Sequence, residues 1–167
     1  ETVVETISPY LLDAPTECIE RRSNPINDVP PFIRGSQPTD DGNLILTEEE
    51  KAELIKQEPL AEQFIRPFMM GKDFILRKPR YCLWMQGANP ADIKKCPHIM
   101  DRIANVREFR LRSTKASTRM KADTPMVFDE IRVPTSNYIG FPTVSSQNRK
   151  YVPIDFLDQN IIPGNKV

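Results

Sequence analysis

The stretch PHIMDRIANVREFRLRSTKASTRMK, residues 97–121, predicts the longest helix of the chain. Pro97 suits the first position of a helix, because the N–H that proline lacks would have no partner there. The apolar residues Ile99, Ile103 and Val106 then recur at helical spacing. We therefore expect a helix whose inner side is fixed by these three residues.

The two hydroxyl residues Ser113 and Thr114 decide how the cations after this helix are presented. Both are mediocre helix formers. If the helix continues through them, Arg112, Lys115 and Arg119 share a face roughly opposite the apolar side. If it stops, the loop beyond it carries these charges. Either arrangement directs them outward.

A central strand and three shorter helices are predicted upstream. Residues 80–85 are aromatic and apolar without clean alternation, which is typical of a strand covered on both faces. Thr47, with Glu50 three residues later, forms a capping box and starts a helix that Pro59 interrupts. Two further short helices are expected, one at residues 60–65 and one opening at Pro90.

The remainder of the chain is rich in proline, with sixteen residues spread from Pro9 to Pro163. This usage favours short extended segments joined by turns. Strands are expected at residues 10–12, 18–20, 128–133, 138–144 and 151–154, with breaks at residues 28–31 and 37–43 and a hairpin tip at residues 145–150. The fold class is α+β: mixed sheet, several short helices, one longer helix and Pro-rich connections. No internal boundary or repeat is visible, so residues 1–167 are expected to form a single domain.

Charge is strongly polarised along the sequence although the net charge is zero. Residues 1–62 hold fourteen acids and five bases, whereas residues 63–167 hold nine acids and eighteen bases. Residues 102–121 carry seven Arg or Lys residues against a single acid, Glu108. Such a segment suits a polyphosphate, and nucleic acid is the leading candidate partner. The alternative is that the two oppositely charged parts dock on each other or on a partner domain.

Two polar segments carry the residue types that recognise DNA. Arg and Lys neutralise phosphates, hydroxyls donate to phosphate oxygens, and base edges are recognised by Arg on guanine and by Asn or Gln on adenine. The alternatives are a solvated basic helix end for the first segment and an ordinary polar turn for the second. The candidate DNA-binding residues are Arg112, Ser113, Thr114, Lys115, Ser117, Thr118, Arg119 and Lys121, together with Ser145, Ser146, Gln147, Asn148, Arg149 and Lys150.

Catalytic and cofactor motifs are not found. The six glycines are never closer than seven residues apart, so neither a glycine-rich turn for S-adenosylmethionine nor a phosphate-binding loop is present. Amino-methyltransferases place Asn or Asp directly before Pro-Pro-aromatic, but here Val29 stands there and cannot accept a bond from the target amine. His98 has no partner signature for nucleophilic catalysis, and Cys96 with His98 supplies too few ligands for zinc. We expect no catalytic, cofactor-binding or metal-binding residue in the chain.

Several conspicuous side chains are better explained by packing than by recognition. Trp84, Tyr81 and Phe109 lie in apolar segments and are expected in the core. Arg110 falls on the apolar side of its helix, so we expect it to pair with a buried carboxylate or to extend to the surface. The three cysteines are far apart and fit reduced thiols.

No apolar run approaches the length of a membrane helix, and the start lacks a signal-peptide layout. We therefore expect a cytoplasmic location of bacterial type, at the nucleoid through DNA, and no membrane partner. The opening sequence suggests a piece excised from a larger polypeptide.

Taken together, these segments resemble the target recognition domain of MmeI-like adenine-specific DNA methyltransferases, some of which are fused restriction and modification enzymes. The resemblance spans nearly the whole chain. It rests on the ordered segments SPYLLDAP (8–15), DVP (28–30), DGNLIL (41–46), FIRP (64–67), YCLW (81–84), VREFR (106–110), ADTP (122–125), VSS (144–146) and YVPI (151–154).

The resemblance implies that this chain binds double-stranded DNA and recognises a short asymmetric site. It further implies that a separate methyltransferase domain of the same polypeptide binds S-adenosylmethionine and methylates adenine N6, with an endonuclease fused in some relatives. The family's specificity lies in loops corresponding to residues 113–120 and 145–149. Relatives often place Glu after the Ser-Ser pair, whereas this chain has Gln147. A docking or structural module without base recognition is the alternative function.

Overall fold

The computed structural model describes residues 3, 6–15 and 20–167, which divide into two units, Glu1–Phe32 and Ile33–Val167.

The unit Glu1–Phe32 contains neither helix nor strand among its described residues. The strand predicted at residues 10–12 is wrong, because this segment turns. The Leu11 amide donates to the Ser8 carbonyl at 2.9 Å, and the Ser8 amide donates to the Leu12 carbonyl at 2.9 Å. Leu11 has a φ of 59°, in the left-handed region that a strand does not use. The strand predicted at residues 18–20 falls mainly outside the described residues.

A mixed four-stranded sheet forms the frame of the unit Ile33–Val167, in the order β1-β3-β2-β6. β1 (Ile45–Leu46) and β2 (Ile65–Met69) both pair antiparallel with β3 (Arg80–Leu83), while β6 (Ile162–Pro163) pairs parallel with β2. The interior position of β3 confirms the central strand predicted at residues 80–85. β2 was not predicted, and it contains Pro67, a residue that is rare inside sheets. Pro67 lacks a backbone N–H, but β6 pairs only with Phe68 and Met69 of β2, so no bond to β6 is lost at Pro67.

The predicted helices are present. α1 (Glu48–Gln57) has the predicted capping box: the Glu50 amide donates to Thr47 Oγ1 at 3.2 Å and the Thr47 amide donates to Glu50 Oε2 at 2.9 Å. The helix at residues 60–65 is a 3-10 helix, η1 (Pro59–Phe64). Proline opens both α3 (Pro90–Ile93) and the fifteen-residue α4 (Pro97–Leu111). The short α2 (Gly71–Leu76) was not predicted.

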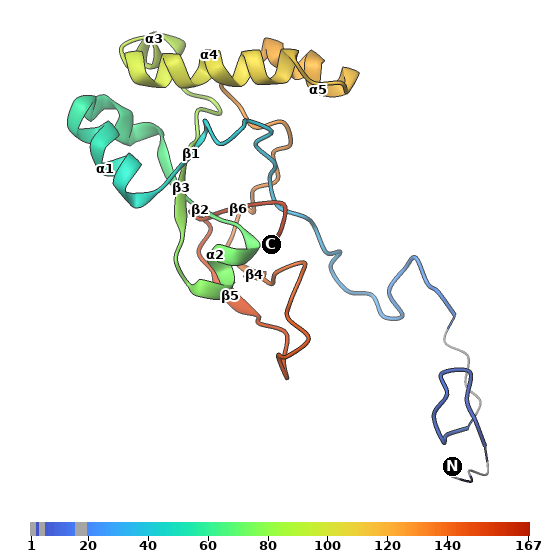
Figure 1. Ribbon diagram of the computed structural model, residues 1–167. Coiled ribbons are helices and arrows are strands. Elements are labelled where there is room, and N and C mark those ends of the chain that lie inside the picture. Colours follow the sequence, from blue (N-terminus) through green and yellow to red (C-terminus); the bar gives the residue numbers. More distant parts are fainter. Residues whose placement is uncertain (1–2, 4–5, 16–19) are drawn as a thin grey trace. The chain divides into compact units, whose positions relative to one another are not determined.

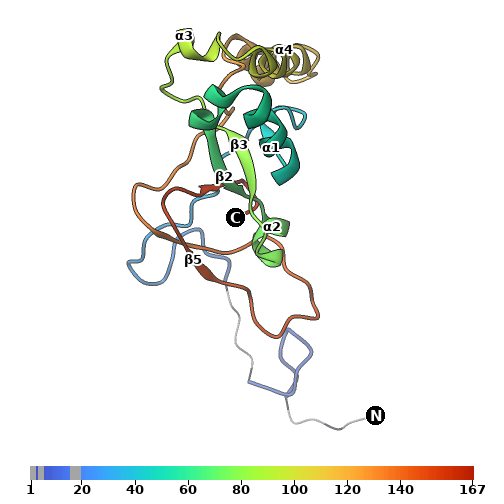
Figure 2. The same cartoon turned by 90° about the vertical axis from the view of Figure 1, so that its left-hand side faces the viewer.

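The main core lies between α4 and the sheet. Ile99, Ile103 and Val106 are buried there, as their spacing predicted, and they belong to one cluster with Leu83 of β3 and Phe68 of β2. Trp84 and Tyr81 are half-buried against this cluster, and Phe109 is also half-buried. Figure 1 shows α4 across one end of the unit, and β4 and β5 at the other end; Figure 2 shows the same separation from the side.

The last third of the chain departs most from the predictions. The strand predicted at residues 128–133 is a single bridge between Gln37 and Glu130. The strand predicted at residues 138–144 is shortened to β4 (Tyr138–Gly140), and the one predicted at residues 151–154 is displaced to β5 (Asp155–Leu157). β4 and β5 pair antiparallel, so residues 145–150 lie in a long connection and not at the tip of a tight hairpin. The sequence thus predicted two strands on either side of residues 145–150 but not the limits of those strands.

Arg110 joins α4 to two turns of the chain. Its side chain is 0% exposed, and burial lowers the pKa of its guanidinium. The expected carboxylate partner is wrong: the guanidinium donates only to backbone carbonyls in the hydrogen bonds found here. The five acceptors, at 2.8–3.0 Å, are the carbonyl oxygens of Pro38, Thr39, Lys121, Thr124 and Val127. Turns leave carbonyls without helix or sheet partners, and the five donors of a guanidinium match them.

The N-terminus of α4 is capped by a carboxylate from another element. Cys96 precedes the helix and makes no side-chain capping bond. Instead, Glu58 Oε1 accepts from the His98 amide at 2.6 Å and lies 2.7 Å from His98 Nδ1. A carboxylate at this position satisfies a free helix amide and interacts favourably with the helix dipole. Both ends of α4 are therefore held by long-range contacts.

Removal of the Arg110 side chain is expected to destabilise the protein strongly. Arg110→Ala leaves five carbonyl oxygens without their donor and empties a buried site, and loss of such a network should cost ~3–5 kcal/mol of unfolding free energy. Urea denaturation followed by circular dichroism measures this change. The matched control is Arg107→Ala on the exposed side of α4, where we expect a change within ~0.5 kcal/mol. Equal effects of the two substitutions would contradict the structural role of Arg110.

Candidate nucleic-acid interface

The helix that carries the first candidate segment stops at Leu111. Arg112 caps it, and the Ser113 amide donates to the Arg110 carbonyl at 3.2 Å. The Ser113 hydroxyl then accepts from the Lys115 amide at 3.2 Å, which replaces a helical bond with a local turn. The chain resumes as α5 (Ala116–Met120), followed by η2 (Lys121–Asp123). The single helical face considered for Arg112, Lys115 and Arg119 is therefore wrong, and the alternative, a break at Ser113 and Thr114, is what the structure has.

The four cations of this segment are all exposed but differ in their partners. The Arg119 guanidinium donates to the Ser113 and Thr114 carbonyls, both at 2.9 Å, and so closes the turn. Lys121 Nζ donates to the Asp129 carbonyl at 3.2 Å and lies 3.9 Å from its carboxylate. Arg112 Nε makes a long 3.4 Å contact with the Glu108 carbonyl. Within the described part of the chain, the Lys115 ammonium has no hydrogen-bond or ion-pair partner, so it is the cation most available to a ligand.

The hydroxyl residues of the segment also differ in their exposure to solvent. Thr114 and Ser117 are exposed, and Ser113 is half-buried with its hydroxyl in the turn. Thr118 is only 9% exposed. Its side chain is therefore less accessible to a ligand than those of Thr114 and Ser117.

The second candidate segment, residues 145–150, is exposed throughout. A turn holds its centre: the Arg149 amide donates to the Ser146 carbonyl at 3.0 Å, and the Asn148 amide donates to Ser146 Oγ at 3.2 Å. Among the described residues, the side chains of Gln147, Asn148 and Arg149 have no intramolecular partner. Lys150 Nζ lies 5.5 Å from the centre of the Tyr151 ring. This loop presents two amides and a guanidinium whose hydrogen-bonding groups are all available.

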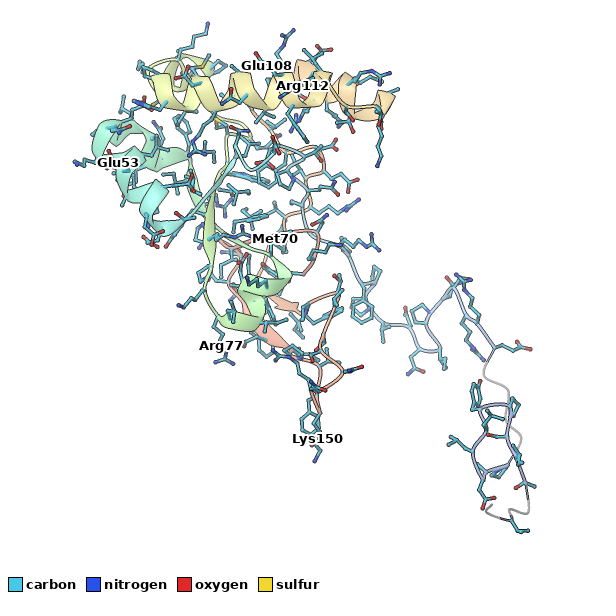
Figure 3. All side chains as sticks on the ribbon, in the orientation of Figure 1. Glu53, Met70, Arg77, Glu108, Arg112 and Lys150 are labelled. Carbon is cyan, nitrogen blue, oxygen red and sulfur yellow. The ribbon has the colours of Figure 1, made fainter. Side chains whose placement is uncertain are left out.

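The structure does not bring the two candidate segments together. Figure 3 places Arg112 at the end of α4 and Lys150 at the opposite end of the same unit. The coincidence of the two segments in one basic half of the sequence therefore does not produce one continuous basic patch. A ligand that contacts both must be extended, as a DNA duplex is.

Arg107 was omitted from the sequence candidates although it belongs to the cationic run. It is exposed on α4, and its guanidinium has no partner within the described residues. By contrast, Arg102 donates to the Asn43 carbonyl at 3.0 Å and to Glu50 Oε1 at 3.1 Å. The cationic run at residues 102–121 pointed to Arg107 in the sequence. Only the structure distinguishes it from Arg102 and Arg110, whose guanidinium groups are bound within the protein.

The described residues contain no group of three or more His, Cys, Asp or Glu side chains suited to a metal ion. Cys96 is buried, and the imidazole of His98 is bound to Glu58. Burial raises the pKa of the Cys82 thiol to about 12 and also raises that of Cys96. Thiols with raised pKa values are poor nucleophiles and poor metal ligands. No helix in the described part of the chain is long and apolar enough to cross a bilayer.

Comparison with known proteins places this fold in a family. The model of the MmeI target recognition domain matches residues 13–167. The chain belongs to this family. The sequence-based assignment to a target recognition domain of MmeI-like enzymes is thereby confirmed, and the observed α+β architecture agrees with it.

Two relatives extend this result. DNA methyltransferase A of Bacillus subtilis (strain 168) is 34% identical over 165 residues, which cover 99% of this chain and 19% of the relative. The Type IIL restriction-modification enzyme MmeI, whose structure was solved in complex with DNA, is 41% identical with a TM-score of 0.88, over 98% of this chain and 22% of MmeI. The target recognition domain thus spans about a fifth of the length of these two relatives.

The two described cysteines of this target recognition domain are expected to be unreactive in the native state. Their raised pKa values keep both as thiols at pH 8, below the pKa of about 12 for Cys82. In a Cys18→Ser variant, titration with an aromatic disulfide reagent should release almost no chromophore until denaturant is added. Rapid native reaction of two thiols would contradict the burial of Cys82 and Cys96.

Proposed function

We propose that this target recognition domain recognises the base sequence of double-stranded DNA for an adenine methyltransferase of which it forms one part. The observation that carries the proposal is the exposed loop at residues 145–150. Its Gln147, Asn148 and Arg149 side chains are unpartnered within the described residues, in a chain that matches the corresponding part of an enzyme solved with DNA.

The loop has the chemistry for direct base recognition. Amide side chains pair with the N6 and N7 edge of adenine, and Arg pairs with the O6 and N7 edge of guanine. The Ser146–Arg149 hydrogen bond holds Gln147 and Asn148 in a narrow turn, which fits the width of a major groove. Gln147 and Arg149 are therefore assigned to base contacts, while the hydroxyls of Ser145 and Ser146 and the ammonium of Lys150 are assigned to the flanking backbone.

The segment after α4 has the chemistry for sequence-independent phosphate binding. Lys115 is its free cation, and Arg112, Thr114 and Ser117 are exposed beside it. Arg119 acts mainly on the turn, since its guanidinium is bound to the Ser113 and Thr114 carbonyls. Ser113 and Lys121 are assigned to the two ends of this proposed phosphate-binding segment. Because the two segments lie at opposite ends of the unit, they would contact the duplex at separate places.

Methyl transfer is assigned to the remainder of the polypeptide. This chain lacks a glycine-rich turn for the cofactor and an Asn or Asp directly before its Pro-Pro-Phe segment. S-adenosylmethionine would be bound by a separate methyltransferase domain, which would methylate adenine N6. Residues 1–167 would then act as one target recognition domain within a longer cytoplasmic enzyme.

The competing function is a docking module without base recognition, which the opposite charges of the two parts of the sequence favour. Methylome sequencing of cells that express the full-length parent distinguishes the two. Base recognition predicts N6-methyladenine at one short asymmetric motif. The absence of any modified motif in cells with an active parent would overturn the proposal.

Substitutions in the loop at residues 145–150 are expected to change which sequence is methylated. Gln147→Ala or Arg149→Ala removes a bidentate base contact, which is worth ~1–3 kcal/mol of discrimination. The methylome should then show a motif degenerate at one position. Gln86→Ala, at another exposed glutamine, is the control and should leave the motif intact. An unchanged motif in both loop variants would exclude these residues from base contact.

Substitution of Lys115 is expected to weaken binding to all sequences equally. Lys115→Ala removes one phosphate contact, so the slope of log affinity against log salt should fall by about 1. Fluorescence anisotropy with cognate and scrambled duplexes across a salt series measures this slope. Lys56→Ala, an exposed lysine of α1, is the control. If both variants keep the parental slope, Lys115 does not contact phosphate.

A further inference from the structure

The β4–β5 pair has one buried face and one exposed apolar face. On the buried face, Tyr138 and Leu157 are cross-strand neighbours that belong to a small cluster with Met69 and Phe74. On the other face, Ile139 and Phe156 are cross-strand neighbours, 59% and 79% exposed. A paired isoleucine and phenylalanine facing solvent contribute nothing to the packing of this unit.

The surrounding surface continues this apolar character. The unit Ile33–Val167 has thirteen exposed large hydrophobic residues, and seven of them are in this region: Leu76, Ile139, Val144, Tyr151, Val152, Ile154 and Phe156. A hollow of about 310 Å³ lies between α2 and the residues after β4, with Ile75, Leu76 and Val144 in its lining and Lys72 and Lys166 also around it. Exposed apolar residues gathered at one end of a unit are typical of an interaction site.

The charges around this surface do not suit DNA. No Lys or Arg occurs from Tyr151 to Asn165, whereas Asp155 and Asp158 flank Phe156. The Arg77 guanidinium lies 3.6 Å from the Asp155 carboxylate, which offsets its charge. The two carboxylates beside Phe156 would repel phosphates, so a protein surface is the better occupant of the face formed by Ile139 and Phe156. The two lysines at the hollow further favour a partner with a carboxylate beside its apolar residues.

We propose that Ile139, Phe156 and the adjoining hollow form the surface on which the methyltransferase domain of the same polypeptide docks. This inference rests on the proposed function, in which the chain is one part of a longer methyltransferase. The occupant is chosen because this chain spans only 19% and 22% of its two relatives, so most of such a polypeptide lies outside it. β4 and β5 are also the two supports of residues 141–154, so docking on them would fix the DNA-reading loop relative to the domain that receives the adenine.

Photo-cross-linking in the full-length parent tests this inference. Phe156 is replaced by p-benzoylphenylalanine, an aromatic residue that captures neighbouring C–H bonds on irradiation. Without DNA, we expect an intramolecular cross-link to peptides of the methyltransferase domain, and loss of that cross-link when Ile139→Ser is added. Met120, which is 75% exposed on α5, carries the same photoreactive residue in the control. That control should give no such cross-link without DNA and should label a cognate duplex when one is present.

Each other result overturns the inference. A cross-link from position 156 to DNA only would assign this face to the duplex. A cross-link between two copies would make it a self-association surface, and no cross-link or one to a different domain would remove the methyltransferase domain as occupant. Methylome sequencing of cells that express the same variants reports separately on the proposed function. A normal methylated motif without the expected cross-link would therefore reject the docking surface alone.

Discussion

The Arg110 guanidinium, buried between two turns, fixes where α4 ends and what can follow it. It holds the carbonyls of Pro38 and Thr39 on one side and those of Lys121, Thr124 and Val127 on the other. A full positive charge without water is costly unless its donors are satisfied, and here five carbonyls satisfy them. The chain after α4 therefore turns back, so that residues 121–127 lie against the Arg110 guanidinium. This return places the segment with Lys115 outside the core while anchoring it at both ends.

Long-range polar contacts also hold the N-terminal end of α4. Glu58, from the end of α1, caps the helix through the His98 amide, and Arg102 binds the Asn43 carbonyl and Glu50. These contacts join the acidic part of the sequence to the basic part within one unit. The opposite charges of the two parts thus partly neutralise each other inside the fold. Of the cations at residues 102–121, all of which the structure describes, Arg107 and Lys115 are left without an internal partner.

The fold places two exposed polar segments, which the sequence showed only as parts of one basic half, at opposite ends of one unit. We propose phosphate contacts at the α4–α5 junction and base contacts in the loop at residues 145–150, while an exposed apolar face lies on β4 and β5, which carry that loop. Affinity, specificity and docking can then change independently, because each depends on different elements. A change in Gln147 or Arg149 does not disturb Arg110 or the main core.

The sequence by itself determined the local features, since these depend on neighbours along the chain. Proline at Pro90 and Pro97, the capping box at Thr47 and the spacing of Ile99, Ile103 and Val106 set the helices, and the quoted segments were sufficient to place the chain in its family. Only the tertiary structure decided the partners of Arg110, the burial of Thr118, the pairing of β2 through Pro67, and the distance between the two candidate segments. Those features depend on contacts between residues far apart in the sequence. Such contacts form through the free carbonyl groups of turns and through the pairing register of strands. No local pattern encodes such contacts.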